Sequence, residues 1–240
     1  MRRIVIGFVA ALILLGVTSG IVRSFMPATL GARAEPARLR LLHALHRDDP
    51  HADVRAAEIR RVEARFAAHP TVIFLHALSG ALFLMLAPLQ LWTKFRARHV
   101  TLHRRTGVML IAIGVVTACT GFYFGVLHPA AGPGEVIVIA IVSALFLWSL
   151  ARAVAAIRKR RLAAHRRWMI RAFAVALGIS TVRIVALIAD FLLTPAGFTL
   201  VEIFVLSLWA GWGITVAAAE VWIRNQPESN AVAAVAVSPL

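Results

Sequence analysis

Histidines near the ends of long apolar segments are the residues of this sequence best suited to chemistry. His103 and His165 each stand at the basic start of such a segment, while His76 and His128 lie toward the opposite ends of two segments. Axial ligation of a b-type haem needs two neutral imidazoles at one depth on different helices of a bundle. We therefore expect His103 and His165 to ligate the iron of a haem b, and we consider His76 and His128 as a second pair.

Arginines stand close to the first pair of histidines. Arg104, Arg166 and Arg171 follow them in the sequence and are suited to neutralising haem propionates. The same pattern has a plainer interpretation, because histidines inside basic loops at the ends of spans are often interfacial residues without a ligand.

A second group of ionisable residues is expected inside the membrane. His165 and Arg183 are eighteen residues apart, which is about five full helical turns, and Asp190 points within about 20° of Arg183. Placing Arg183 inside the membrane costs at least about 2.5 kcal/mol of free energy unless the side chain is paired or hydrated. Asp190 and Glu202 are its available partners. We expect a polar pocket toward the outer side. It serves either as a buried ion pair that fixes helix register or as an anion- or proton-handling site.

The second apolar segment adds one more polar group to that expectation. Gln90 shares a helical face with His76, and we include it among the residues of the polar pocket.

Glycines follow one face of the third apolar segment. Gly107, Gly114, Gly121 and Gly125 fall within about 40° of one direction, together with His103 and His128 at its ends. Two interpretations are open: small residues that let helices pack closely, or a flat groove that accepts a planar ring.

The elements that must position these residues are membrane spans. Hydrophobic residues make up 60% of the 240-residue chain and charged residues 15%, with a mean hydropathy of +0.80. This composition excludes a water-soluble globule and a disordered chain. We predict an all-α polytopic bundle of six transmembrane helices, since a span needs about 20 apolar residues. The expected spans are Ile4–Val22, Thr71–Thr93, Thr106–Leu127, Val136–Ile157, Trp168–Asp190 and Leu200–Ile223.

The distribution of charge predicts the orientation. The formal net charge is +15, but the Lys and Arg residues cluster in the loops 94–105 and 158–167, whereas the loops 128–135 and 191–199 contain none. This is the positive-inside pattern of a multi-pass protein of the inner (cell) membrane, with both termini cytoplasmic. We expect the lipid bilayer as partner and no binding of nucleic acid.

The chain divides into four parts on this pattern. Residues 1–22 form an anchor, which we favour over a cleaved signal peptide because the apolar run is long and its end is a poor cleavage site. Between Arg23 and Pro70 lies a polar insert outside the cytoplasm, with short amphipathic helices, one of them capped by Asp49 before Pro50. Residues 71–224 form a five-helix transmembrane domain, and residues 225–240 a disordered cytoplasmic tail.

Motifs of hydrolases and transferases are absent from the sequence. It contains no glycine-rich phosphate loop, no His-Glu-x-x-His zinc motif and no recognisable serine or cysteine triad. Cys119 is the only cysteine, and the histidines of the insert are irregularly spaced, which disfavours a zinc or copper site. Whether the protein is an enzyme stays open.

Two motifs carry a family resemblance. Residues 103–107 read His-Arg-Arg-Thr-Gly and residues 165–171 read His-Arg-Arg-Trp-Met-Ile-Arg, with Arg183 downstream. In these motifs, over about residues 71–193, the chain resembles a family of uncharacterised bacterial membrane proteins catalogued as domain of unknown function 2306. The resemblance implies a membrane architecture but no mechanism.

A looser resemblance is to the six-span, di-haem cytochromes b that pass electrons from ascorbate. Their paired histidines come from the second and fourth and from the third and fifth spans. His103 and His165 match the second of these pairs, but the fourth span here has no histidine. Two classes of function follow from the sequence. One is a haem-b-binding membrane redox component, and the other is a non-redox carrier, sensor or assembly factor in which the polar pocket works and the histidines respond to pH.

Overall fold

The computed structural model describes residues 2–30 and 52–225, and within those residues all regular structure is helical. The expected all-α membrane bundle is confirmed. The helices are α1 (Arg2–Leu30), α3 (Ala52–Ala68), α4 (Pro70–Leu91), α5 (Thr93–Arg98), α6 (Val100–Phe122), η1 (Tyr123–Leu127), α7 (Pro133–Arg158), α8 (Leu162–Leu193) and α9 (Leu200–Arg224).

Five of the described helices are long and apolar enough to cross a membrane: α4, α6 with η1, α7, α8 and α9. In α1 the apolar part, Ile6–Val22, is shorter. Helices are expected at these runs because a backbone in lipid must satisfy its own hydrogen bonds. The run expected to reach Thr93 ends at Leu91, where Trp92 adopts an extended conformation before α5 begins.

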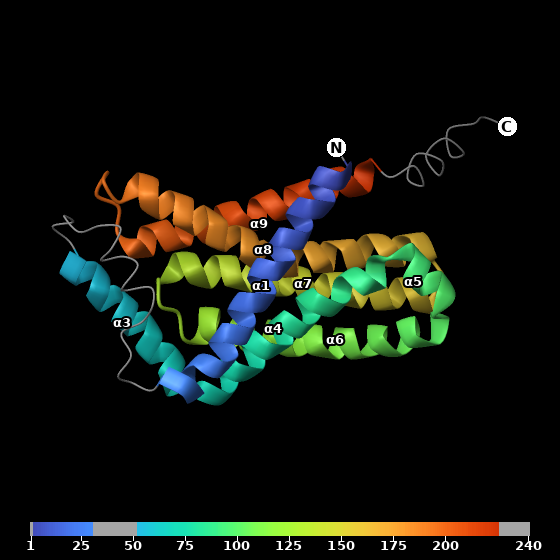
Figure 1. Ribbon diagram of the computed structural model, residues 1–240, viewed down its shortest axis with the longest axis horizontal. Helices are drawn as coiled ribbons and strands as arrows, with labels where there is room; N and C mark the ends of the chain where they lie inside the picture. The colour runs from blue at the N-terminus through green and yellow to red at the C-terminus, as the bar shows by residue number, and fades with distance from the viewer. Residues whose placement is uncertain (1, 31–51, 226–240) are drawn as a thin grey trace.

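Four of these helices form a closed ring. α4 packs on α6, α6 on α7, α7 on α8, and α8 on α4, so that α6 and α8 lie diagonally across the middle. α1 runs across the outside of α4 and α8, and α9 packs along α8 (Figure 1). α5 and the turn 159–161 lie at one end of the bundle, which we call the basic end, and α3 lies at the other, the α3 end (Figure 1).

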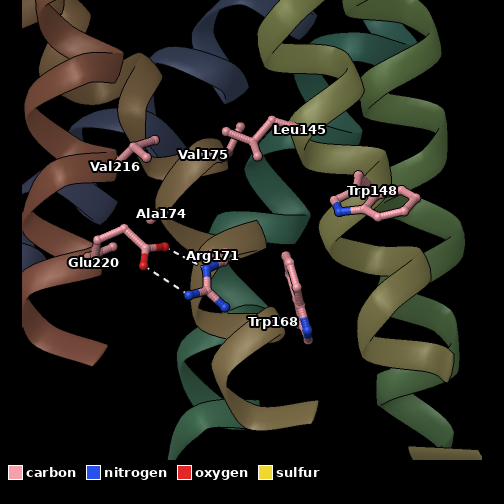
Figure 2. Close-up of a pocket in the computed structure, with 9 residues that line it drawn as sticks. Leu145, Trp148, Trp168, Arg171, Ala174, Val175, Val216 and Glu220 are labelled. Atoms are coloured by element: carbon pink, nitrogen blue, oxygen red, sulfur yellow. Dashed lines mark hydrogen bonds and ion pairs between the residues drawn. The ribbon is translucent and has the colours of Figure 1, made fainter. Parts of the chain in front are cut away.

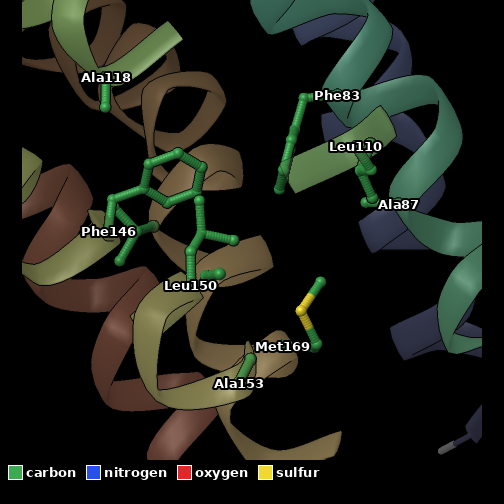
Figure 3. Close-up of a cluster of buried hydrophobic side chains, with 10 residues drawn as sticks. Phe83, Ala87, Leu110, Ala118, Phe146, Leu150, Ala153 and Met169 are labelled. Atoms are coloured by element: carbon green, nitrogen blue, oxygen red, sulfur yellow. The ribbon is translucent and has the colours of Figure 1, made fainter. Parts of the chain in front are cut away.

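The interior of the ring is filled by apolar side chains from all four helices. Phe83 of α4 meets Phe146 of α7 edge to face, with ring centroids 5.3 Å apart. Leu110, Leu150 and Met169 continue this core toward the basic end (Figure 3). Burial of side chains of this size contributes about 1.5–3 kcal/mol each in water, but in lipid the gain comes mainly from close packing.

The glycine face of α6 is a packing surface. A Cβ atom at Gly114 would lie 3.0 Å from Leu150 and 3.1 Å from Phe83, and one at Gly125 would lie 2.5 Å from Ile139. At Gly121 the neighbour is the ring of His76, at 3.1 Å. The alternative of a flat groove for a planar ring is therefore wrong at these three positions, because side chains of α4 and α7 already occupy the space.

Small residues also bring α8 and α9 together. A Cβ at Gly178 would meet the Trp212 ring at 2.1 Å, and one at Gly211 would meet the Val182 backbone at 2.5 Å. The Trp212 indole N–H donates to the Val175 carbonyl at 2.9 Å, which satisfies the one polar atom of that ring. Close approach of backbones is the usual basis of helix association in lipid.

The outer surface of the bundle is apolar. Large hydrophobic side chains stand exposed along the spans, among them Leu14, Val108, Trp148 and Phe191. Such a surface is unfavourable in water and appropriate to contact with lipid.

The polar insert is described from α3 onward. The expected cap at Asp49 and Pro50 and a further short helix before it lie outside the described residues, as does the tail from residue 226. Ala56 and Ile59 of α3 are buried against Leu200 at the start of α9. α3 therefore caps one end of the bundle.

Candidate functional site

The two histidines expected to ligate haem lie at the basic end of the ring. His103 is in the first turn of α6 and His165 in the first turn of α8, and these are the two helices that face each other diagonally. α4 and α7 each lie between α6 and α8 in the ring. The two histidines therefore belong to helices on opposite sides of the bundle.

Hydrogen bonding distinguishes the two imidazoles. His165 Nδ1 lies 2.9 Å from the carbonyl oxygen of Ala153. An imidazole that donates from Nδ1 to a backbone carbonyl presents its Nε2 lone pair, which is the usual arrangement of a metal-ligating histidine. His103 Nδ1 is buried and has no hydrogen-bond partner among the described residues. A buried ring nitrogen without a partner is uncommon, and His103 lacks the Nδ1 acceptor that fixes the His165 ring.

Arg171 does not lie with these histidines. Its Nε and Nη2 atoms donate to the two carboxylate oxygens of Glu220 on α9, at 2.5 and 2.9 Å. Its guanidinium carbon also lies 4.6 Å from the centre of the Trp168 ring. Six residues on a helix turn the side chain about 240° from His165. Arg171 is thus paired with a carboxylate of the protein, and its role beside a haem propionate stays a prediction.

Gln90 also lies apart from the pocket expected for it. Its side-chain amide donates to Thr106 Oγ1 at 2.6 Å, near the basic start of α6. Asp190 and Glu202 lie at the other end, close to the end of α8 and the start of α9. The helical angle gave the face of Gln90 correctly, but its position along α4 separates it from those carboxylates by about the length of a span.

His76 lies between α4 and α6. Its Nδ1 is 3.2 Å from the Thr117 carbonyl oxygen and 3.1 Å from Thr120 Oγ1. Arg183 lies in α8, which packs against α4. The interior of the bundle therefore contains a histidine and an arginine from different helices.

His128 has neighbours other than His76. Its ring centroid lies 4.7 Å from that of His69 and 4.5 Å from that of Tyr123. The Tyr123 hydroxyl is 3.1 Å from His69 Nδ1. The His69 and His128 imidazoles are too close together to admit a porphyrin between them. The π-helical turn η1, in which the His128 N–H bonds to the Tyr123 carbonyl, positions this cluster.

The carboxylates expected around Arg183 have partners that the sequence did not indicate. Asp190 forms an ion pair with Arg55 of α3. Glu202 is exposed and accepts from the Thr199 hydroxyl and backbone N–H, which completes a capping box at the start of α9. Glu202 thus stabilises a helix end.

Arg65 of α3 binds the same end of the bundle. Its Nη1 atom donates to the His128 carbonyl at 2.6 Å and lies 3.3 Å from a carboxylate oxygen of Glu135. The other oxygen of Glu135 accepts from the backbone N–H groups of Ala130 and Ala131, both at 2.7 Å. Glu135 is 3% exposed. Its buried charge is therefore stabilised by Arg65 and by the backbone N–H groups of the loop.

Sequence reasoning missed Arg55 and Arg65 for a simple reason. Both lie in a segment with nine arginines, where nothing local separates them from the exposed Arg60 and Arg61. His69 and Tyr123 were missed because their contact depends on how α4 meets η1.

The fold and these sites define a multi-pass, all-helical membrane protein. The chain belongs to the family described as "Predicted membrane protein (DUF2306)", whose model matches residues 73–223. The match confirms the family indicated by the two motifs and extends through α9. No curated protein and no solved structure matches the chain significantly.

Proposed function

We propose that this protein binds one haem b at the basic end of its bundle, with His103 and His165 as axial ligands. One observation carries the proposal: the two histidines stand in the first turns of α6 and α8, which lie diagonally opposite each other in the ring. Bound there, the haem would supply one-electron transfer within the membrane.

The protein's own contribution is to orient the ligands and exclude water. The Ala153 carbonyl holds the His165 ring and its tautomer. Leu110 and Met169 are buried nearby and keep the surroundings apolar, which is a means by which proteins set haem potential. We propose a single haem, because the His128 ring packs at a tilt against the rings of His69 and Tyr123.

The orientation expected from charge is part of the proposal. We place the basic end and both termini on the cytoplasmic side of the inner membrane, on the evidence of the basic loops 94–105 and 158–167.

Variants of single histidines test the ligand assignment. His103→Ala and His165→Ala should each lose the sharp α-band of the reduced protein, because each removes one axial ligand. His99→Ala is the matched control, since His99 is exposed one turn before His103 and should keep the spectrum. His103→Met keeps a ligand, so it should retain haem with a raised reduction potential. A parent haem spectrum that survives in the His103→Ala, His165→Ala double variant would show that the ligands lie elsewhere.

A second candidate is a non-redox carrier, sensor or assembly factor that uses the polar interior. The observation in its favour is that His76 and Arg183 lie within the spans α4 and α8, which pack on each other. In this case the purified protein is colourless when expressed with ample haem, and Arg183→Ala impairs folding or ligand binding.

A further inference from the structure

A pocket of about 200 Å³ lies between α7, α8 and α9 (Figure 2). It is smaller than the roughly 300–1,000 Å³ typical of pockets that enclose a whole small molecule, so it suits one part of a larger ligand. It is separate from the histidines of the proposed haem site, and its walls include Trp148, Trp168, Arg171 and Glu220.

The polarity of the pocket changes along the bundle axis. Leu145, Val175 and Val216 line the part toward the middle of the membrane (Figure 2). Arg171 and Glu220 line the part toward the basic end, and α8 and α9 both show this order. A slot that is apolar toward the membrane centre and charged toward its surface matches the two parts of a phospholipid.

Arg152 lies beside the charged part of the pocket. Its guanidinium carbon is 5.5 Å from the centre of the Trp148 ring and 5.4 Å from that of Trp168. Among the described residues it forms no hydrogen bond or ion pair, and it is exposed. Six residues separate it from the end of α7, so it stands about 9 Å inside that end.

The local charge favours an anion. Arg171 is neutralised by both oxygens of Glu220, which leaves the charge of Arg152 without a carboxylate among the described residues. A cation at the membrane surface is stabilised by an anionic headgroup, and arginine binds phosphate through a planar fork of donors.

We infer that this pocket binds an anionic phospholipid, with the phosphate on Arg152 and acyl carbons against Leu145, Val175 and Val216. Trp148 is 56% exposed on the side of the bundle, so a lipid can enter laterally from the leaflet. The apolar half of the slot contributes nothing to a free phosphate ion, which makes the lipid the better occupant. The inference does not depend on haem binding.

Lipid titration of the delipidated, full-length protein tests the inference. Phosphatidylglycerol should raise the thermal unfolding temperature saturably, and native mass spectrometry should retain a lipid on the chain. Phosphatidylcholine with the same acyl chains and inorganic phosphate should each have a much smaller effect. Arg152→Gln should weaken the apparent affinity for phosphatidylglycerol roughly tenfold, which corresponds to about 1.4 kcal/mol of binding free energy.

Arg158→Gln is the matched control, because it removes the same charge from an exposed position at the end of the same helix. This variant should bind phosphatidylglycerol like the parent. Arg152→Lys keeps the positive charge at this position. This variant should bind phosphatidylglycerol more tightly than Arg152→Gln. Equal stabilisation by phosphatidylcholine or by phosphate, or equal losses in Arg152→Gln and Arg158→Gln, would overturn the inference.

Discussion

Arg65 joins α3 to the loop before α7 through a single guanidinium group. It reaches the His128 carbonyl and the buried Glu135 carboxylate, so a polar helix outside the spans is fixed to the transmembrane bundle. Removal of one partner from a buried ion pair is strongly destabilising, because the remaining charge stays buried.

Arg65→Ala should therefore lower the free energy of unfolding by about 3 kcal/mol, measured by denaturant titration of the purified protein. Arg61→Ala is the control, because Arg61 is exposed on the same helix and should change stability little. Similar unfolding curves for the two variants would contradict a stabilising role for the Arg65–Glu135 pair.

At the scale of single residues, the sequence predicted the helical face on which a side chain lies better than the residue that it contacts. The spacing of His165, Arg183 and Asp190 gives their common face, since a helix turns about 100° per residue. The partner of Asp190 is Arg55, which is 135 residues away in the chain. No local pattern indicates such a contact, because it arises only when α3 folds over the ends of α8 and α9.

At the scale of elements, α8 and α9 show how small residues determine packing. Gly211 lies where an added Cβ would meet the Val182 backbone at 2.5 Å, whereas an added Cβ at Gly213 meets nothing within 4 Å. Both positions are on α9, two residues apart, so they form a matched pair.

Gly211→Ala should destabilise the protein by about 1–3 kcal/mol, because the backbones must separate to admit the methyl group. Gly213→Ala should be neutral or slightly stabilising, since alanine is the better helix former. Thermal unfolding of both variants in one detergent gives the comparison. A loss in Gly213→Ala as large as that in Gly211→Ala would refute close packing of α8 on α9.

The spans were predictable because length and hydropathy determine them, and the expected runs from 106 to 223 lie within the helices found. The break at Trp92 and the π-helical turn Tyr123–Leu127 were not predictable. At the π-helical turn a neighbouring helix is in close contact: Ile139 of α7 lies within 2.5 Å of where a Cβ on Gly125 would stand.

At the scale of the whole molecule, the ring of α4, α6, α7 and α8 brings His103 and His165 to one end, although 62 residues separate them in the chain. The sequence indicated their equal depth, because each follows a basic loop. It did not indicate that α6 and α8 lie diagonally, since that depends on the order of the helices around the ring.

The orientation proposed for the molecule predicts which loops face the cytoplasm. In a Cys119→Ala background, Lys159→Cys should react with a membrane-impermeant maleimide only after the cells are opened. Pro129→Cys, in a loop without Lys or Arg, should react on intact spheroplasts. Both positions are exposed, so access of the reagent depends on the side of the membrane. The reverse pattern of labelling would contradict the orientation.

A reduced-minus-oxidised visible spectrum of the purified protein, with pyridine haemochrome quantitation, tests the central proposal most directly. The arrangement of His103 and His165 on facing helices predicts a sharp α-band and one haem b per chain. A colourless protein from cells with ample haem would contradict it, and the Arg183 and His76 region would then become the site to pursue.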